Sequence, residues 1–103
     1  MYSKNELKRM FLRVLYEIQY GGLTGCSNSV NGIISSWFKR YWDVGLSEAE
    51  RKLLREGVKE MMSDGLVQRD EAQPTGDFVV LTDFGRDVVE RQLDPDSHAK
   101  KYF

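Results

Sequence analysis

The sequence predicts a mostly helical α+β domain whose elements follow the order helix, helix, helix, strand, strand, helix. Three observations lead to this prediction. Apolar residues recur at spacings of three and four in three separate stretches, as they do on helices with one buried face. Two short β-prone runs follow, separated by a loop that contains Pro74 and Gly76. A last stretch with helical apolar spacing predicts the fourth helix.

The first helix is expected to span residues 4–20. Ser3 and Glu6 have the spacing of a capping box, and apolar residues follow at helical intervals. Gly21 and Gly22 are expected to end the helix, because glycine tolerates the left-handed conformation that is common at helix C-termini.

A polar loop at residues 24–29 precedes a second helix, which is expected at residues 29–42 despite Gly32 within it. The apolar side of this helix is broad and unusually aromatic. One helix can hardly bury four large aromatic side chains in a domain of this size. Trp37 and Phe38 are expected in the core. The other two, Tyr41 and Trp42, are expected at a homodimer interface.

Ser47 and Glu50 repeat the capping-box pattern and open a third helix, which Gly65 closes. Residues 66–69 and 77–81 are the two β-prone runs, and they are expected to pair as a hairpin. The apolar side of the third helix consists of Leu53, Leu54, Val58, Met61 and Met62.

Thr82 can cap a final helix at residues 83–93, and Pro95 stops it. The chain has the common size of one domain, so residues 1–93 are expected to form a single domain. Residues 94–103 show no periodicity and are expected to form an irregular tail.

The composition excludes several classes of protein. With 41% hydrophobic residues the chain is too apolar for a disordered protein, and no apolar run approaches the roughly 18 to 20 residues that span a bilayer. Residues 1–8 are polar, unlike a secretory signal peptide. The single cysteine, Cys26, cannot form an internal disulfide. A cytoplasmic location is therefore expected.

No catalytic constellation is apparent. Cys26 has no Cys or His nearby, and the single histidine, His98, lies in the tail. The glycine-containing stretch 21–25 lacks the Gly-Lys-Ser/Thr ending of a phosphate-binding loop. We therefore expect no enzymatic activity and no metal or cofactor.

The small net charge of −1 conceals an uneven distribution. Six basic and two acidic residues precede Asp43, whereas nine basic and fourteen acidic residues follow from that position. Such asymmetry is typical of a surface with a positive side, although ordinary solvated helix faces explain it equally well.

Two motifs resemble winged helix-turn-helix regulators of the MarR-like and PadR-like families. The run GVKEMMSDGLVQR at residues 57–69 resembles the end of their recognition helix and the first strand of their wing. The run VLTDFGRDVV at residues 80–89 is similar to their second wing strand and following helix. The resemblance covers about residues 47–92. It implies a third helix that enters the major groove of DNA and a hairpin that forms the wing.

The expected wing differs from those families at its tip. Residues 70–77 contain three acids, Asp70, Glu71 and Asp77, and no Lys or Arg. Wings that contact DNA in those families usually carry arginine, so contact between this wing and phosphate is in question.

The third helix carries the candidate DNA-contacting residues. Arg51, Lys52, Arg55 and Lys59 fall within an arc of roughly 100° on the side opposite Leu54 and Met61. Under the winged-helix interpretation Arg51 and Arg55 would contact bases, and Lys52 and Lys59 would contact phosphates. Ser47 begins the same helix and joins the site.

Other basic residues have weaker claims to a site. Lys39 and Arg40, late in the second helix, could hold the DNA backbone beside the groove. For Lys8, Arg9 and Arg13 we favour simple exposure to solvent. The third helix also has a plain explanation, because Glu48 and Lys52 could form a weak i, i+4 pair on an ordinary solvent face.

These observations support two hypotheses of function. The first is a small, dimeric winged-helix protein that binds double-stranded DNA and regulates transcription. The alternative is a winged helix that serves as a protein-interaction or assembly module, which the acidic wing and the aromatic second helix favour. Binding to duplex DNA that weakens steeply with salt would separate them.

Overall fold

Within residues 1–74 and 76–92, which this computed structural model describes, the chain forms four helical segments and one antiparallel hairpin. The α+β, mostly helical prediction is confirmed. The predicted irregular tail, His98 and the domain limit at residue 93 lie outside the described residues. The elements are α1 (Lys4–Tyr20), α2 (Val30–Gly32), the π-helix η1 (Ile33–Trp37), α3 (Phe38–Trp42), α4 (Glu48–Ser63), β1 (Val67–Arg69), β2 (Val79–Leu81) and α5 (Asp83–Glu90).

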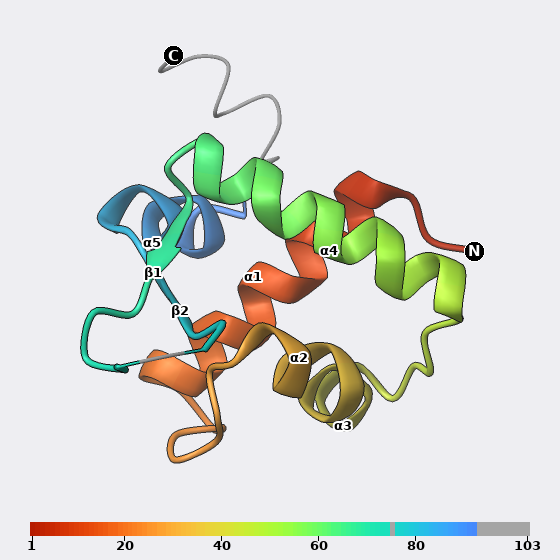
Figure 1. The fold of residues 1–103 in the computed structure, drawn as a ribbon, viewed down its shortest axis with the longest axis horizontal. Helices are drawn as coiled ribbons and strands as arrows, with labels where there is room; N and C mark the ends of the chain where they lie inside the picture. The colour runs from red at the N-terminus through yellow and green to blue at the C-terminus, as the bar shows by residue number, and fades with distance from the viewer. Residues whose placement is uncertain (75, 93–103) are drawn as a thin grey trace.

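α1 is the helix around which the other elements pack. It passes behind α4 through the middle of the molecule (Figure 1), and it also contacts α3, β2 and α5. The predicted capping box is present, with the Ser3 side chain accepting from the Glu6 backbone N–H and the Glu6 carboxylate accepting from the Ser3 N–H. Leu7, Phe11 and Val14 are fully buried, so one face of this amphipathic helix supplies the centre of the core.

α1 ends at the predicted place but not by the predicted conformation. Gly21 has φ −131° and ψ −142°, outside the left-handed region. The Glu17 side chain folds back over this turn, and its Oε2 accepts from the Gly22 N–H at 3.0 Å. A Cβ on Gly21 would lie 2.1 Å from that oxygen. A larger residue here would displace the Glu17 carboxylate that caps the end of the helix.

The second helix is continuous from Val30 to Trp42 but contains a π-helical turn that the apolar spacing did not predict. In η1 the Phe38 N–H bonds to the Ile33 carbonyl five residues earlier. Ile33 and Phe38 are fully buried, and Trp37 is half-buried against the core, as predicted for the aromatic residues of this turn. The helix ends at Asp43, which has φ 55°.

α4 begins with the predicted capping box between Ser47 and Glu50. Glu50 is buried and also accepts from the Tyr2 N–H at 2.9 Å, which attaches the N-terminus of the chain to the start of α4. Most of the predicted apolar side faces the core. Met62 is the exception, because 43% of its surface is exposed, and its assignment to the buried side was wrong. At about 100° per residue Met62 falls on the same side of α4 as Arg51 and Arg55, both of which are exposed.

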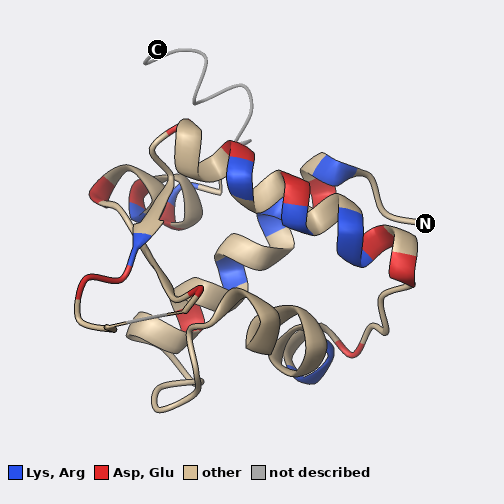
Figure 2. Ribbon diagram, viewed as in Figure 1, with Lys and Arg blue, Asp and Glu red and all other residues tan. Residues whose placement is uncertain are grey.

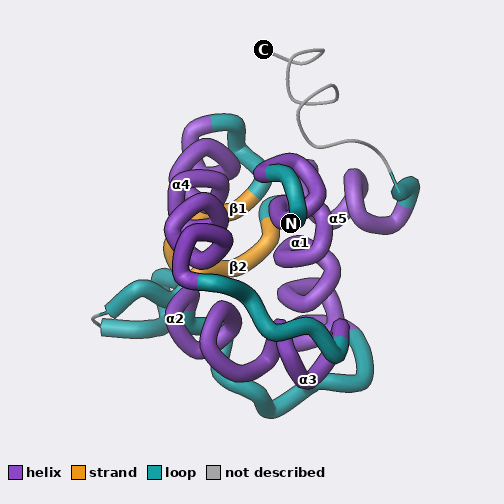
Figure 3. Tube along the Cα trace, turned by 90° about the vertical axis from the view of Figure 1, so that its right-hand side faces the viewer, coloured by secondary structure: helices purple, strands orange, loops and turns teal. Residues whose placement is uncertain are grey.

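The hairpin has the predicted order but a third participant. β1 and β2 pair antiparallel with Val67 opposite Leu81 and Arg69 opposite Val79. Ser29 forms an isolated bridge with Phe78 on the outer edge of β2, so the end of the predicted loop 24–29 pairs like a strand. Figure 3 shows the hairpin between α4 and α1. This position ties the start of the second helix to the hairpin.

α5 packs against the hairpin at very short range. Thr82 caps the helix by accepting from the Gly85 N–H at 2.9 Å, as predicted. A Cβ on Gly85 would lie 1.9 Å from the Leu66 carbonyl oxygen. Only glycine allows this approach, which buries Val88 and Val89 against the core.

No helix among the described residues is long and apolar enough to cross a membrane.

Candidate nucleic-acid interface

The outward face of α4 carries all four of its predicted DNA-contacting cations. Arg51, Lys52, Arg55 and Lys59 are exposed, and Ser47 is exposed at the N-cap. The opposite face, which includes Leu54 and Val58, is buried against α1. The helical spacing therefore assigned these side chains to solvent correctly. α4 lies across one side of the molecule, with nothing drawn in front of it in the view of Figure 1.

The side chains on this face differ in what holds them. Among residues 1–74 and 76–92, Arg51, Lys52 and Lys59 have no hydrogen-bond or ion-pair partner. The expected pair between Glu48 and Lys52 is not formed. Arg55 alone is held, because its guanidinium donates to the side-chain oxygen of Asn31 on α2. Three of the four cations are thus free to meet an external anion.

Acidic residues interrupt the cationic face. Glu48 and Glu56 are exposed on α4, and Figure 2 shows acidic and basic positions alternating along this helix. The face therefore has four cations and two carboxylates that have no ion-pair partner among residues 1–74 and 76–92. The acids lower the positive potential of this face, which is therefore weaker than that of a continuous basic stripe.

Lys39 and Arg40 are also exposed, but they lie on α3. They are in the last turn of the second helix, before the loop that leads to α4, and Figure 2 shows basic positions on that part of the chain. Arg40 lies over the Trp37 ring, with its Cζ 5.6 Å from the ring centroid. Asp43 is exposed in the connecting loop, so the two basic surfaces are separated by an acid.

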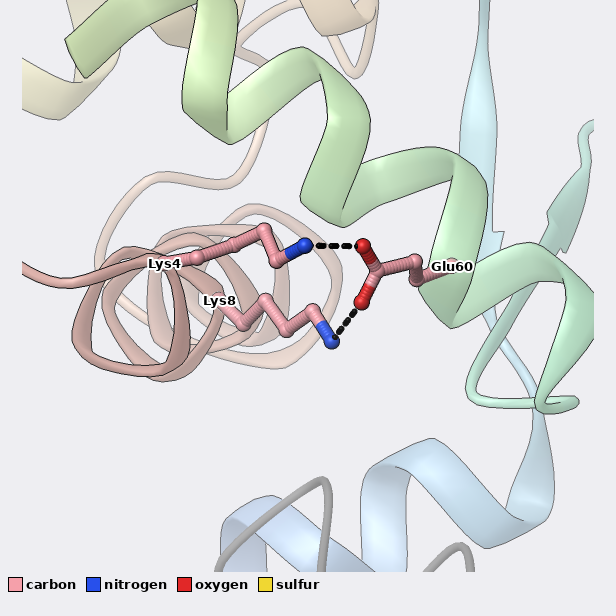
Figure 4. Close-up of polar contacts among 3 residues, drawn as sticks. All are labelled: Lys4, Lys8 and Glu60. Atoms are coloured by element: carbon pink, nitrogen blue, oxygen red, sulfur yellow. Dashed lines mark hydrogen bonds and ion pairs between the residues drawn. The ribbon is translucent and has the colours of Figure 1, made fainter.

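An ion pair that the sequence analysis missed joins α4 to α1. Glu60 on α4 accepts from Lys4 and from Lys8, the latter at 2.7 Å from Nζ to Oε1 (Figure 4). Lys8 is only 1% exposed, so its expected exposure to solvent was wrong. The hydrogen bonds from Lys4 and Lys8 lower the pKa of Glu60. A Cβ on Gly57 would lie 3.0 Å from Lys8 Cγ, so this glycine gives the lysine stem its space.

The acids of the hairpin loop have different surroundings. Asp70 accepts from the Asn28 side chain at 2.9 Å, and Asp77 accepts from the Asn31 backbone N–H at 3.1 Å. Glu71 faces water, with 88% of its side chain exposed and only a long contact of 3.9 Å to Arg69. Asp77 therefore holds the loop to the second helix and Asp70 holds it to the segment just before that helix, while Glu71 remains for an external partner.

Tyr41 and Trp42 are half-buried and have partners within their own chain. The Trp42 Nε1–H donates to the Met10 carbonyl at 3.0 Å, and Arg13 donates to the Tyr41 hydroxyl at 3.3 Å. The two rings meet edge to face with centroids 5.0 Å apart. Their polar atoms are thus satisfied without a second copy, and a dimer could use only the parts that remain exposed.

A cleft of about 390 Å³ lies beside Trp42, between α1 and α5. Its lining mixes charged and apolar side chains: Glu6, Arg9, Met10, Leu12, Arg13, Trp42, Val88, Val89 and Gln92. Arg13 also pairs with Glu17 at 3.0 Å, so its charge is partly compensated. The cleft is on the α1 and α5 side of the molecule and is separate from the exposed face of α4.

Within the described part of the chain, no three His, Cys, Asp or Glu side chains are grouped to hold a metal ion. Cys26 is a half-buried free thiol.

No protein-family model, curated protein or solved structure matches the chain.

Proposed function

We propose that the protein is a small winged helix-turn-helix DNA-binding protein that acts as a transcriptional regulator. In this proposal α4 is the recognition helix and the hairpin is the wing. The order of three helices, hairpin and helix supports it. A second support is the bridge between Ser29 and Phe78, because Ser29 precedes the second helix and adds a third strand-like segment to the wing. The resemblance of residues 47–92 to MarR-like and PadR-like regulators points to the same function.

The main support for the proposal is the cationic face of α4. Arg51, Lys52 and Lys59 are exposed on one face of α4 and have no partner among the described residues, while the opposite face is buried. An α-helix fits the major groove of B-DNA, where arginine can bond to guanine edges and lysine to phosphates. Arg51 and Arg55 would then contact bases, and Lys52 and Lys59 would contact the backbone.

The remaining predicted contacts lie at the edges of this interface. Ser47 caps α4 and could donate to a phosphate near the start of the helix. Lys39 and Arg40 would contact the DNA backbone from α3. Because Asp43 lies between α3 and α4, these two residues contribute less than the cations of α4.

Binding of the full-length protein to a mixed-sequence DNA duplex tests the proposal. Affinity measured by fluorescence anisotropy should fall steeply between about 50 and 200 mM salt, because each neutralised phosphate releases counterions. The double variant Arg51→Ala/Arg55→Ala should lose this binding. The matched control is Arg86→Ala/Arg91→Ala, which removes the same charge from α5, where both arginines pair with acids four residues away.

The control variant should bind as the unchanged protein does. If neither mixed-sequence duplexes nor duplexes from the protein's own genomic neighbourhood bind at about 50 mM salt, DNA binding is ruled out. Equal affinities of the two double variants would also contradict the assignment of α4 as the contacting helix.

A protein-interaction or assembly module is the second candidate, and the acidic wing favours it. Glu71 is exposed at the loop tip, 3.9 Å from Arg69, which also donates to the Gln73 and Pro74 carbonyls. Residues 67–81 thus carry three acids and one cation. A wing of this charge repels phosphate. The same anisotropy measurement separates the two functions, since an assembly module would ignore duplex DNA.

A further inference from the structure

Arg55 differs from the other cations of the α4 face because another element already holds it. Its Nε and Nη2 both approach the Asn31 Oδ1, at 3.4 and 3.2 Å. Two donors of one guanidinium therefore converge on a single acceptor across the gap between α4 and α2. The two residues are 24 positions apart, so the contact depends on the tertiary fold.

Asn31 is itself fixed from two sides. Its backbone N–H donates to the Asp77 carboxylate at 3.1 Å, and its carbonyl accepts from the Ser35 hydroxyl at 2.7 Å. The neighbouring Val30 N–H donates to the Asp77 carbonyl at 2.9 Å. The acceptor that holds Arg55 thus stands on a backbone that is anchored to the hairpin.

This arrangement leaves a defined part of the guanidinium free. A guanidinium has five N–H donors in a rigid plane, and contacts at Nε and on one side of Nη2 leave an N–H on each terminal nitrogen for a planar acceptor pair. That is the geometry with which arginine contacts the O6 and N7 atoms of guanine. Arg51 has no such support and would lose its rotamer freedom on binding.

We propose that Asn31 is a positioning residue that presents Arg55 to a base pair, and that Arg55 in consequence determines the sequence preference of the site. This inference rests on the proposed DNA-binding function. It assigns Arg51, Lys52 and Lys59 to contacts that raise affinity for every sequence, because unheld cations adapt to phosphates wherever these lie.

The test is selection from a duplex library randomised over about ten base pairs, one turn of B-DNA. The full-length protein and its Asn31→Ala, Asn31→Asp and Arg55→Ala variants are each used. The matched control is Ser36→Ala, because Ser36 is exposed on the same helix and has no side-chain hydrogen bond among the described residues. Asn31→Ala keeps the backbone N–H that bonds to Asp77, and circular dichroism verifies that each variant is folded.

Arg55→Ala and Asn31→Ala should each lose the preference at the same base pair, by about tenfold, the discrimination expected of one bidentate arginine contact. Asn31→Ala should keep its affinity for mixed-sequence DNA, whereas Arg55→Ala should weaken it and reduce the salt slope by about one. Asn31→Asp restores the acceptor, so it should restore the preference while its added negative charge lowers affinity for all sequences. Ser36→Ala should select the same sequences as the unchanged protein.

The possible failures are distinct. If the unchanged protein binds no duplex, the proposed function and this inference both fall. If it binds without sequence preference, DNA binding stands and the inference is overturned. The inference is also overturned if Asn31→Ala keeps the original preference, or if it loses preference at a base pair that Arg55→Ala leaves intact.

Discussion

Lys8 on α1 and Glu60 on α4 form an ion pair in which a lysine that is 1% exposed meets a carboxylate that is 42% exposed. Lys4 reaches the same carboxylate, so Glu60 joins two turns of α1 to one position of α4 (Figure 4). Because α4 carries the candidate DNA-contacting face, this pair is one of the contacts that hold that helix against α1.

Removal of Glu60 should destabilise the fold. Glu60→Ala removes a carboxylate that accepts from the buried Lys8 at 2.7 Å, and losing one partner of a buried pair costs several kcal/mol. Since Glu60 is partly exposed, solvent compensates some of this, and we expect a loss of about 1–3 kcal/mol in the free energy of unfolding. Urea denaturation measures it.

Glu56→Ala is the matched control for that change. Glu56 is exposed on the same helix without an ion-pair partner among the described residues, so its loss should change stability by less than about 0.5 kcal/mol. Equal unfolding midpoints for the two variants would show that the Lys8 to Glu60 pair does not contribute to stability.

Acid should weaken the fold as the pH drops below the ordinary glutamate value. The pKa of Glu60 is lowered from 4.5 by Lys4 and Lys8, and the pKa of Glu50 is lowered from 4.5 chiefly by the Tyr2 backbone N–H. The unfolded chain therefore binds protons more readily than the folded chain. The stability from both groups is complete above pH 4.5 and is lost as the pH falls through their folded pKa values.

Urea midpoints measured from about pH 7 to about pH 3 follow this loss. Glu50→Gln should be less stable at neutral pH and should show a shallower decline on acidification. Glu56→Gln should decline as the unchanged protein does. A Glu50→Gln variant with an unaltered pH profile would mean that the buried carboxylate is not a source of acid sensitivity.

Gly85 should tolerate no side chain. In Gly85→Ala the new Cβ would overlap the Leu66 carbonyl oxygen, which belongs to the backbone and cannot rotate away. We expect α5 to be displaced, at a cost of about 3 kcal/mol or more. Gly45→Ala is the comparison, because a Cβ there has no atom within 4 Å. Thermal unfolding of both variants measures the difference, and similar melting temperatures would contradict the close packing of α5.

The homodimer predicted from the aromatic second helix remains to be tested. Sedimentation equilibrium at micromolar concentration should find a dimer, and Trp42→Ala should shift it toward monomer because the indole is only half-buried in its own chain. Tyr20→Ala is the control, since Tyr20 is an aromatic residue at the C-terminal end of α1 and is 49% exposed. A monomeric unchanged protein would count decisively against an interface at Tyr41 and Trp42.

Most helix boundaries could be predicted because their signals are local. Ser3 with Glu6 and Ser47 with Glu50 form their capping boxes within one turn. Thr82 caps α5 over the same short range, by accepting from the Gly85 N–H. These interactions need no knowledge of distant residues. The π-helical turn has no such signal, since its apolar residues satisfy an ordinary helical pattern equally well.

The role of Lys8 could not be inferred from its charge, but a weak signal was present. Lys8 stands three residues before Phe11 and seven before Leu15, on the stripe that is buried. Gly57, the residue that makes room for its stem, lies on another helix. The strand-like pairing of Ser29 was missed for a similar reason, because its partner Phe78 is far along the chain.

The sequence by itself determined the helices, their caps and the sharing of one face by Arg51, Lys52, Arg55 and Lys59, because helical periodicity decides these over a few residues. Only the tertiary structure decided which helix faces meet. It joined Glu60 to Lys4 across 56 positions and placed Arg55 on Asn31 across 24. Such contacts depend on how whole elements pack, and no local spacing encodes which surfaces will come together.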